Sequence, residues 1–69
     1  MEYIINMSWD NDAGVWCAVC DEIPLALESN SFDALIERVK ITAQEMLVLN
    51  NKSPLAELCF ITNHWAKIA

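Results

Sequence analysis

The segment from Ser31 to Asn50 constrains the fold most, because its apolar period, its start signal and its stop signal agree. Its apolar residues recur at spacings of three and four, which at about 100° per residue places them on one stripe of a helix. The stripe consists of Phe32, Leu35, Ile36, Val39, Ala43, Met46 and Leu47. Ser31 is a suitable N-cap, and the polar segment 50–54 disfavours further helix. The sequence therefore predicts one amphipathic helix over residues 32–49, whose apolar stripe the rest of the chain must cover.

Alternation of apolar and polar residues, together with short apolar runs, predicts four strands around this helix. The acidic segment 10–14 ends in the only glycine and predicts a tight turn, so the strands on either side form a hairpin with Trp9 opposite Trp16. Pro24 ends the second strand, because proline cannot donate to a central ladder. The expected fold is α+β in the order β-β-β-α-β, with an antiparallel meander, a crossover helix on one face and a last edge strand parallel to the first. The strands are expected over residues 2–9, 15–20, 25–29 and 57–62.

The length of 69 residues fits a single domain spanning residues 1–69, and a monomer of this size is marginally stable. The hydrophobic share is nevertheless 55%, more than one helix on one sheet readily hides, so we expect self-association or a partner. No apolar run approaches the roughly 20 residues of a membrane-spanning helix, and no basic leader precedes an apolar run. We therefore expect a cytoplasmic protein with no membrane association.

One helix covers one face of a sheet, so the other face is the best candidate for an interface. We expect the bulkier face to meet the helix; it carries Tyr3, Ile5, Met7, Trp9, Trp16 and Ala18. The second face then carries Ile4, Val15, Cys17 and Val19 beside Asn6 and Ser8. On the helix, Ile41 and Val48 lie opposite the buried stripe, and we interpret them as tolerated surface residues.

The net charge of −6 is distributed unevenly along the chain. Residues 1–37 contain no Lys or Arg and eight acidic residues: Glu2, Asp10, Asp12, Asp21, Glu22, Glu28, Asp33 and Glu37. Nucleic-acid binding requires clustered basic side chains that displace counterions, so direct binding of DNA or RNA is not expected. The acidity is typical of a solvated surface, and it also favours a basic protein partner.

The cysteines suggest redox or metal chemistry only superficially. Cys17 and Cys20 are separated by an odd offset along a strand, which points the two thiols to opposite faces. Cys59 falls in another apolar strand, and nothing completes a tetrahedral zinc site. We interpret all three as buried, reduced thiols, and we expect no metal and no cofactor.

The remaining polar motifs do not indicate catalysis. Asp10-x-Asp12-x-Gly14 resembles a calcium loop weakly, but the glycine comes one position early and strands flank it. His64 has no nucleophile or carboxylate that the sequence places beside it. Asp21 and Glu22 are adjacent at a corner, where neighbouring side chains do not converge on one substrate, so we interpret them as an acidic rim that can face a partner. We therefore expect no catalytic residue and no enzymatic activity.

The order of these motifs resembles the HicB-type antitoxin domain, and in particular its compact single-domain branch of unknown function. The matching pieces, within residues 3–50, are Trp9-Asp10, the run 12–18, Asp21-Glu22-Ile23-Pro24-Leu25 and Ser31-Phe32-Asp33-Ala34-Leu35. Two departures are present: Leu25 replaces the glycine of the corner, and the residues after Thr62 cannot supply the DNA-binding domain that typical HicB antitoxins carry. The resemblance implies a non-enzymatic, dimerising domain that binds and blocks a small basic RNA-cleaving toxin.

The leading hypothesis is therefore an antitoxin-like protein-binding module that forms homodimers or higher oligomers and masks a basic toxin. The alternative is a solitary homo-oligomeric scaffold with no toxin partner, and a hydrolase or metal-dependent enzyme ranks last. Trp65 is suited either to anchoring an interface or to closing one end of the core. The candidate interface consists of Ile4, Val15, Cys17, Val19, Asp21, Glu22 and Trp65.

Overall fold

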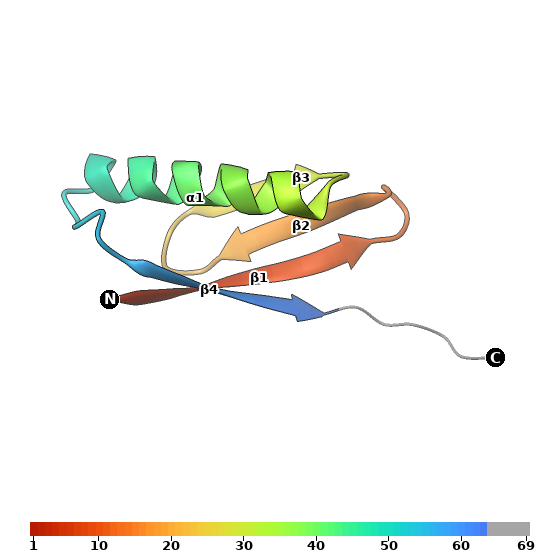
Figure 1. Cartoon of the computed structure of the whole chain (residues 1–69), viewed down its shortest axis with the longest axis horizontal. Helices are drawn as coiled ribbons and strands as arrows, with labels where there is room; N and C mark the ends of the chain where they lie inside the picture. Colours follow the sequence, from red (N-terminus) through yellow and green to blue (C-terminus); the bar gives the residue numbers. More distant parts are fainter. Residues whose placement is uncertain (64–69) are drawn as a thin grey trace.

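The computed structural model describes residues 1–63, which form a four-stranded sheet with one helix against one of its faces (Figure 1). In chain order the elements are β1 (Glu2–Asp10), β2 (Val15–Cys20), β3 (Leu25–Ser29), α1 (Phe32–Leu49) and β4 (Glu57–Asn63). The predicted α+β fold and the order β-β-β-α-β are confirmed. β1 and β4 each extend one residue beyond the predicted strand.

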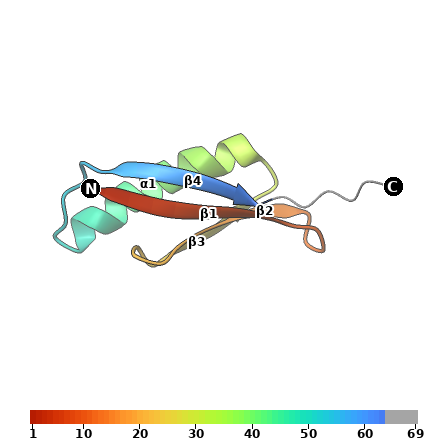
Figure 2. The ribbon, with the colours of Figure 1, turned by 90° about the horizontal axis from the view of Figure 1, so that it is seen from below.

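The strands lie in the order β3-β2-β1-β4, with β1 antiparallel to β2 and parallel to β4. Figure 2 shows β1 and β4 running side by side in the same direction. The predicted pairing of Trp9 with Trp16 is confirmed, and Met7 pairs with Ala18 in the same register. The crossover through α1 therefore delivers the last strand to the outer side of the first, as expected for a helix that covers one face.

The acidic turn between β1 and β2 is organised by Asp10. Its Oδ1 accepts hydrogen bonds from the N–H groups of Asp12 and Ala13 at 3.0 and 3.1 Å, and its carbonyl oxygen accepts one from Gly14 at 2.8 Å. Gly14 adopts a φ of 68°, a conformation that glycine reaches without steric cost. The carboxylate of Asp10 thus closes a hairpin turn, as the sequence predicted for the segment 10–14.

The corner between β2 and β3 is a three-residue turn around Pro24. The N–H of Leu25 donates to the carbonyl oxygen of Ile23 at 2.6 Å, and both side chains are buried. The fixed φ of proline suits the central position of such a turn. Leu25 therefore anchors the corner in the core.

Both ends of α1 have hydrogen-bonded caps. The Ser31 hydroxyl accepts from the N–H of Ala34 at 3.3 Å, which confirms the predicted N-cap. At the other end Asn51 has a φ of 57° and its N–H donates to Val48 O at 3.1 Å, while the N–H of Lys52 donates to Leu47 O at 2.8 Å. This pair of bonds is a Schellman motif, with asparagine in the left-handed position that glycine usually takes.

The core lies between α1 and the sheet face that the sequence assigned to it. Leu35, Val39, Ala43 and Leu47 of the helical stripe are buried, and Phe32, Ile36 and Met46 are half-buried around them. The helix lies closest to β3 and β2. Each fully buried large side chain contributes roughly 1.5–3 kcal/mol of burial free energy. The sheet contributes Tyr3, Ile5, Met7, Ala18, Cys20 and Leu25, and the corner contributes Ile23.

No helix within residues 1–63 has the length and apolar character needed to cross a lipid bilayer.

Candidate functional site

The sheet face turned away from α1 is covered by no element of residues 1–63, and we call it the open face. Strand alternation places on it the residues that lie between the buried ones. The open face consists of Ile4, Asn6, Ser8, Val15, Cys17, Val19, Ala26, Glu28, Cys59 and Ile61. All six residues that the sequence assigned to this face from the first two strands therefore lie there.

The cross-strand register joins these residues into continuous rows. Val19 pairs with Ala26 on one side and with Asn6 on the other, and Asn6 pairs in turn with Ile61. Side chains opposite one another on one face of a sheet are in contact range. Ile61, Val19 and Ile4 are 41%, 43% and 47% exposed, although all three are apolar. The face therefore offers apolar area from several strands at once, which single scattered apolar residues do not.

Acidic side chains lie at the margins of the open face. Glu2 of β1 pairs directly with Glu57 of β4, so two carboxylates are neighbours at one end of the sheet. Glu28 pairs with Cys17 at the margin formed by β3. In residues 1–63 the ion pair joins Lys40 to Glu37 on the helix, 3.2 Å apart, so none of these marginal carboxylates takes part in it. At the β3 margin the Arg38 guanidinium donates to the carbonyl oxygen of Glu28 at 2.9 Å. The open face thus combines an apolar centre with a negative margin.

The other predicted interface residues do not all share this surface. Asp21 and Glu22 are exposed in the turn after β2, as expected for a rim. Glu22, however, lines a small depression beside Met46 and Lys52, near the end of α1 and on the helix side of the sheet. Its assignment to the open-face interface is therefore a prediction that the geometry does not favour. Trp65 and His64 lie outside the described residues.

The three cysteines have different environments. Cys20 is buried, Cys17 is half-buried on the open face, and Cys59 is exposed. The predicted opposite orientation of Cys17 and Cys20 is confirmed, but the expectation that all three thiols are buried is wrong. Cys59 is exposed because it lies on the open face of an edge strand, where nothing in residues 1–63 covers it. All three are free cysteines. Within residues 1–63 no group of three His, Cys, Asp or Glu side chains is arranged to hold a metal ion.

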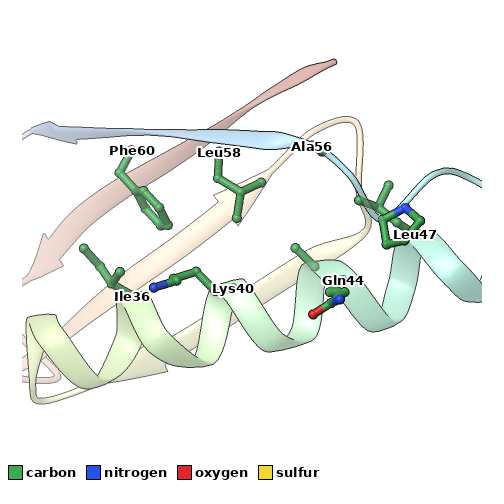
Figure 3. Close-up of a pocket in the computed structure, with 9 residues that line it drawn as sticks. Ile36, Lys40, Gln44, Leu47, Ala56, Leu58 and Phe60 are labelled. Atoms are coloured by element: carbon green, nitrogen blue, oxygen red, sulfur yellow. The ribbon is translucent and has the colours of Figure 1, made fainter.

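A second surface lies between α1 and β4, and we call it the α1–β4 groove (Figure 3). Its volume is about 470 Å³. In Figure 3, Leu58 and Phe60 point from β4 toward the helix, and Ile36 and Lys40 lie opposite them on α1. The groove forms because α1 lies over β3 and β2, which leaves the inward side chains of β4 half-buried. The sequence identified both apolar faces of this strand but not this groove.

The outer face of α1 carries a third apolar area. Ile41 and Val48 are 59% and 55% exposed, which confirms their predicted surface position, and Leu49 beside them is 80% exposed. The sequence did not predict Leu49 as part of this area, because Leu49 is the last residue of the helix and does not belong to the buried stripe. This area comes from one element, whereas the open face draws on all four strands.

The fold and these surfaces define a two-layer α+β domain, with a helix on one sheet face and exposed apolar side chains on a second face that no element of residues 1–63 covers. The chain belongs to the family described as "Domain of unknown function (DUF1902)", which matches residues 2–67. Its structure is similar to the crystal structure of a hypothetical protein from the extremely thermophilic bacterium Thermus thermophilus, with a TM-score of 0.78. The two sequences are 23% identical, and the match covers 99% of this chain and 100% of that chain, so the likeness establishes a shared fold. No curated protein matches the chain significantly.

Proposed function

We propose that this domain is a non-enzymatic, antitoxin-like protein-binding module that neutralises a small basic RNA-cleaving partner through its open face. One observation carries the proposal: exposed Ile4, Val19 and Ile61 form an apolar centre, and the neighbouring carboxylates of Glu2 and Glu57 lie at its margin. The resemblance of the motifs to the HicB-type antitoxin domain supports the same function. A basic partner fits this surface because its charge complements the margin while its apolar side chains bury the centre.

The order of events in binding follows from the charge distribution. Residues 1–37 carry acidic groups and no Lys or Arg, so a basic protein is attracted before it makes contact. Contact then removes the apolar centre from water, which supplies the affinity. The association rate constant is accordingly expected to fall steeply as salt concentration rises, because salt screens the charges.

The proposal is tested by recovering the partner and measuring its inhibition. The tagged protein is incubated with its native lysate at low salt, and proteins that elute at high salt are identified by mass spectrometry. A recovered small basic protein is then purified and assayed for RNA cleavage with and without this chain. We expect inhibition by the parent protein, and we expect its loss in Val19→Asp.

The matched control is Ile41→Asp, which places the same charge at an exposed apolar residue on the outer face of α1. This variant is expected to inhibit as the parent does. Equal inhibition by parent and Val19→Asp would contradict the assignment of the open face, and an association rate independent of salt would contradict electrostatic steering.

The alternative is a homo-oligomeric scaffold without a toxin partner, and the apolar surfaces beyond the open face favour it. Such a protein requires no basic partner encoded nearby. An adjacent reading frame for a small basic protein that contains histidine would favour the toxin-binding function instead.

A further inference from the structure

β4 forms one edge of the sheet, and within residues 1–63 its outer side pairs with no other strand. An unpaired edge presents a row of backbone N–H and C=O groups that another strand can bind. Proteins commonly block such edges with lysine, proline or a covering segment. The sequence of β4 from Glu57 to Asn63 contains no lysine, arginine or proline, and its one charge lies at its first residue.

The opposite edge, formed by β3, is protected by a side-chain hydrogen bond and by the residues in and around the strand. The Arg38 guanidinium donates a hydrogen bond to the carbonyl oxygen of Glu28 at 2.9 Å, which occupies a backbone group of β3. The strand is also shorter, directly follows Pro24 and carries a charged residue, Glu28, one position before its last residue. The two edges of the same sheet therefore differ: β3 is protected, and β4 is open.

The hydrogen bonds with β1 decide which backbone groups of β4 point outward. The N–H of Glu57 donates to the carbonyl oxygen of Met1 at 2.9 Å, and Glu57 pairs with Glu2. In a parallel ladder alternate residues bond to a given neighbour, so Glu57 and every second residue after it face β1. The groups that point outward are those of Leu58, Phe60 and Thr62.

We propose that β4 binds β4 of a second copy of this chain in an antiparallel, two-fold arrangement centred on Phe60. The outward residues are spaced symmetrically about Phe60, so the rotation places Phe60 opposite Phe60 of the second copy and Leu58 opposite Thr62. Each pair exchanges both of its N–H···O bonds, which is the closely spaced pairing of antiparallel strands. Glu57 lies opposite Asn63 in this register, so like charges do not meet.

The same register joins the apolar surfaces of the two copies. The Phe60 side chains meet on the helix side of the sheet, where each lines its own α1–β4 groove. On the other side, Cys59 lies opposite Ile61 of the second copy, and both residues are exposed in a single chain. The two open faces therefore become one continuous face on an eight-stranded sheet, with Cys59 and Ile61 of both copies at its centre. The inference goes beyond the proposed function and does not depend on it, because it requires no basic partner.

The first test measures the mass of the full chain in solution by sedimentation equilibrium. We expect twice the chain mass of 7.8 kDa. Thr62→Pro removes an outward N–H without breaking a bond to β1, so this variant is expected to sediment as a monomer with an unchanged circular dichroism spectrum.

The matched control is Ala26→Pro on the β3 edge. The carbonyl oxygen of Glu28 accepts from Arg38 rather than from β2, so the N–H of Ala26, two residues earlier, also points away from β2. Ala26→Pro therefore makes the same backbone change at the other edge and is expected to remain dimeric. Loss of the dimer in both variants would overturn the assignment to β4.

The second test fixes the register and does not rely on a proline variant that folds. In Ile61→Cys the new thiol lies opposite Cys59 of the second copy, and oxidised glutathione can accept the two electrons released as the disulfide forms. We expect rapid conversion to a covalent dimer on a non-reducing gel. Thr62→Cys, whose thiol lies opposite Leu58, is expected to cross-link far more slowly.

A parent chain that sediments as a monomer would overturn the proposal. So would a dimer that survives Thr62→Pro and dissociates in Val19→Asp, because the open face would then be the interface. Faster cross-linking of Thr62→Cys than of Ile61→Cys would contradict the register. None of these results bears on inhibition of a toxin, which is measured separately.

Discussion

The indole ring of Trp16 and the phenyl ring of Phe32 meet edge to face, with their centroids 4.9 Å apart and their planes at 76°. Trp16 also meets Trp9 edge to face, with the ring centroids 5.5 Å apart and the planes at 62°. These contacts join the β1–β2 hairpin to the first turn of α1. The start of the helix is therefore held by ring packing as well as by the Ser31 cap.

Replacing Phe32 with alanine is expected to lower the free energy of unfolding by about 2–3 kcal/mol, because a half-buried aromatic side chain loses its packing on Trp16. Urea denaturation followed by circular dichroism measures the change. Ile41→Ala on the outer face of α1 is the control and should change the free energy of unfolding by less than about 0.5 kcal/mol. Equal effects would mean that the ring cluster contributes little.

The N-cap can be tested without altering the core. Ser31→Ala removes the acceptor for the N–H of Ala34 and should lower the free energy of unfolding by about 1 kcal/mol. Ser31→Asp keeps an acceptor and adds a negative charge at the positive end of the helix dipole, so it should remain close to the parent. Equal destabilisation by both substitutions would show that the hydroxyl does not act as a cap.

Neighbouring residues of β2 test the two faces of the sheet. Ala18 is fully buried and Val19 is 43% exposed, so Ala18→Asp buries an unpaired charge and is expected to unfold the domain. Val19→Asp is expected to keep a cooperative thermal transition within a few degrees of the parent. A reversal of these results would mean that the faces are exchanged.

Two substitutions of the left-handed residue at the end of α1 are expected to change the free energy of unfolding in opposite directions. Asn51 has a φ of 57°, which glycine adopts at lower cost and alanine at higher cost. Asn51→Gly should therefore keep or raise the free energy of unfolding, and Asn51→Ala should lower it by about 1 kcal/mol. Thermal unfolding of the three proteins in one buffer makes the comparison. A more stable alanine variant would contradict the Schellman geometry.

Local patterns in the sequence predict the elements of this fold well, because each element has a characteristic spacing of apolar residues and is bounded by a turn or capping residue. The stripe from Phe32 to Leu47 specifies the buried face of α1, and the segment 10–14 specifies the hairpin that brings Trp9 to Trp16. Strict alternation in β1 then decides which residues face the helix. These are short-range features, and the structure confirms them.

The features that sequence patterns did not predict depend on how distant elements sit on one another. The position of β4 beside β1 was predicted, but the lateral position of α1 over β3 and β2, which no local pattern specifies, is what creates the α1–β4 groove. The exposure of Cys59 has the same origin, because an edge strand has only one neighbour. Glu22 lines a depression beside Met46 and Lys52 on the helix side, which its adjacency to Asp21 does not reveal.

The parallel pairing of β1 with β4 determines an order of assembly. β1 is connected to its neighbour β2 by one short turn, whereas it is separated from its neighbour β4 by the whole of α1. Pairings between distant segments form late, because closing a longer loop costs more entropy. The hairpin is therefore expected to form first and β4 to dock last. A chain still emerging from the ribosome lacks the β4 edge, so self-association through this edge is confined to chains that have completed folding.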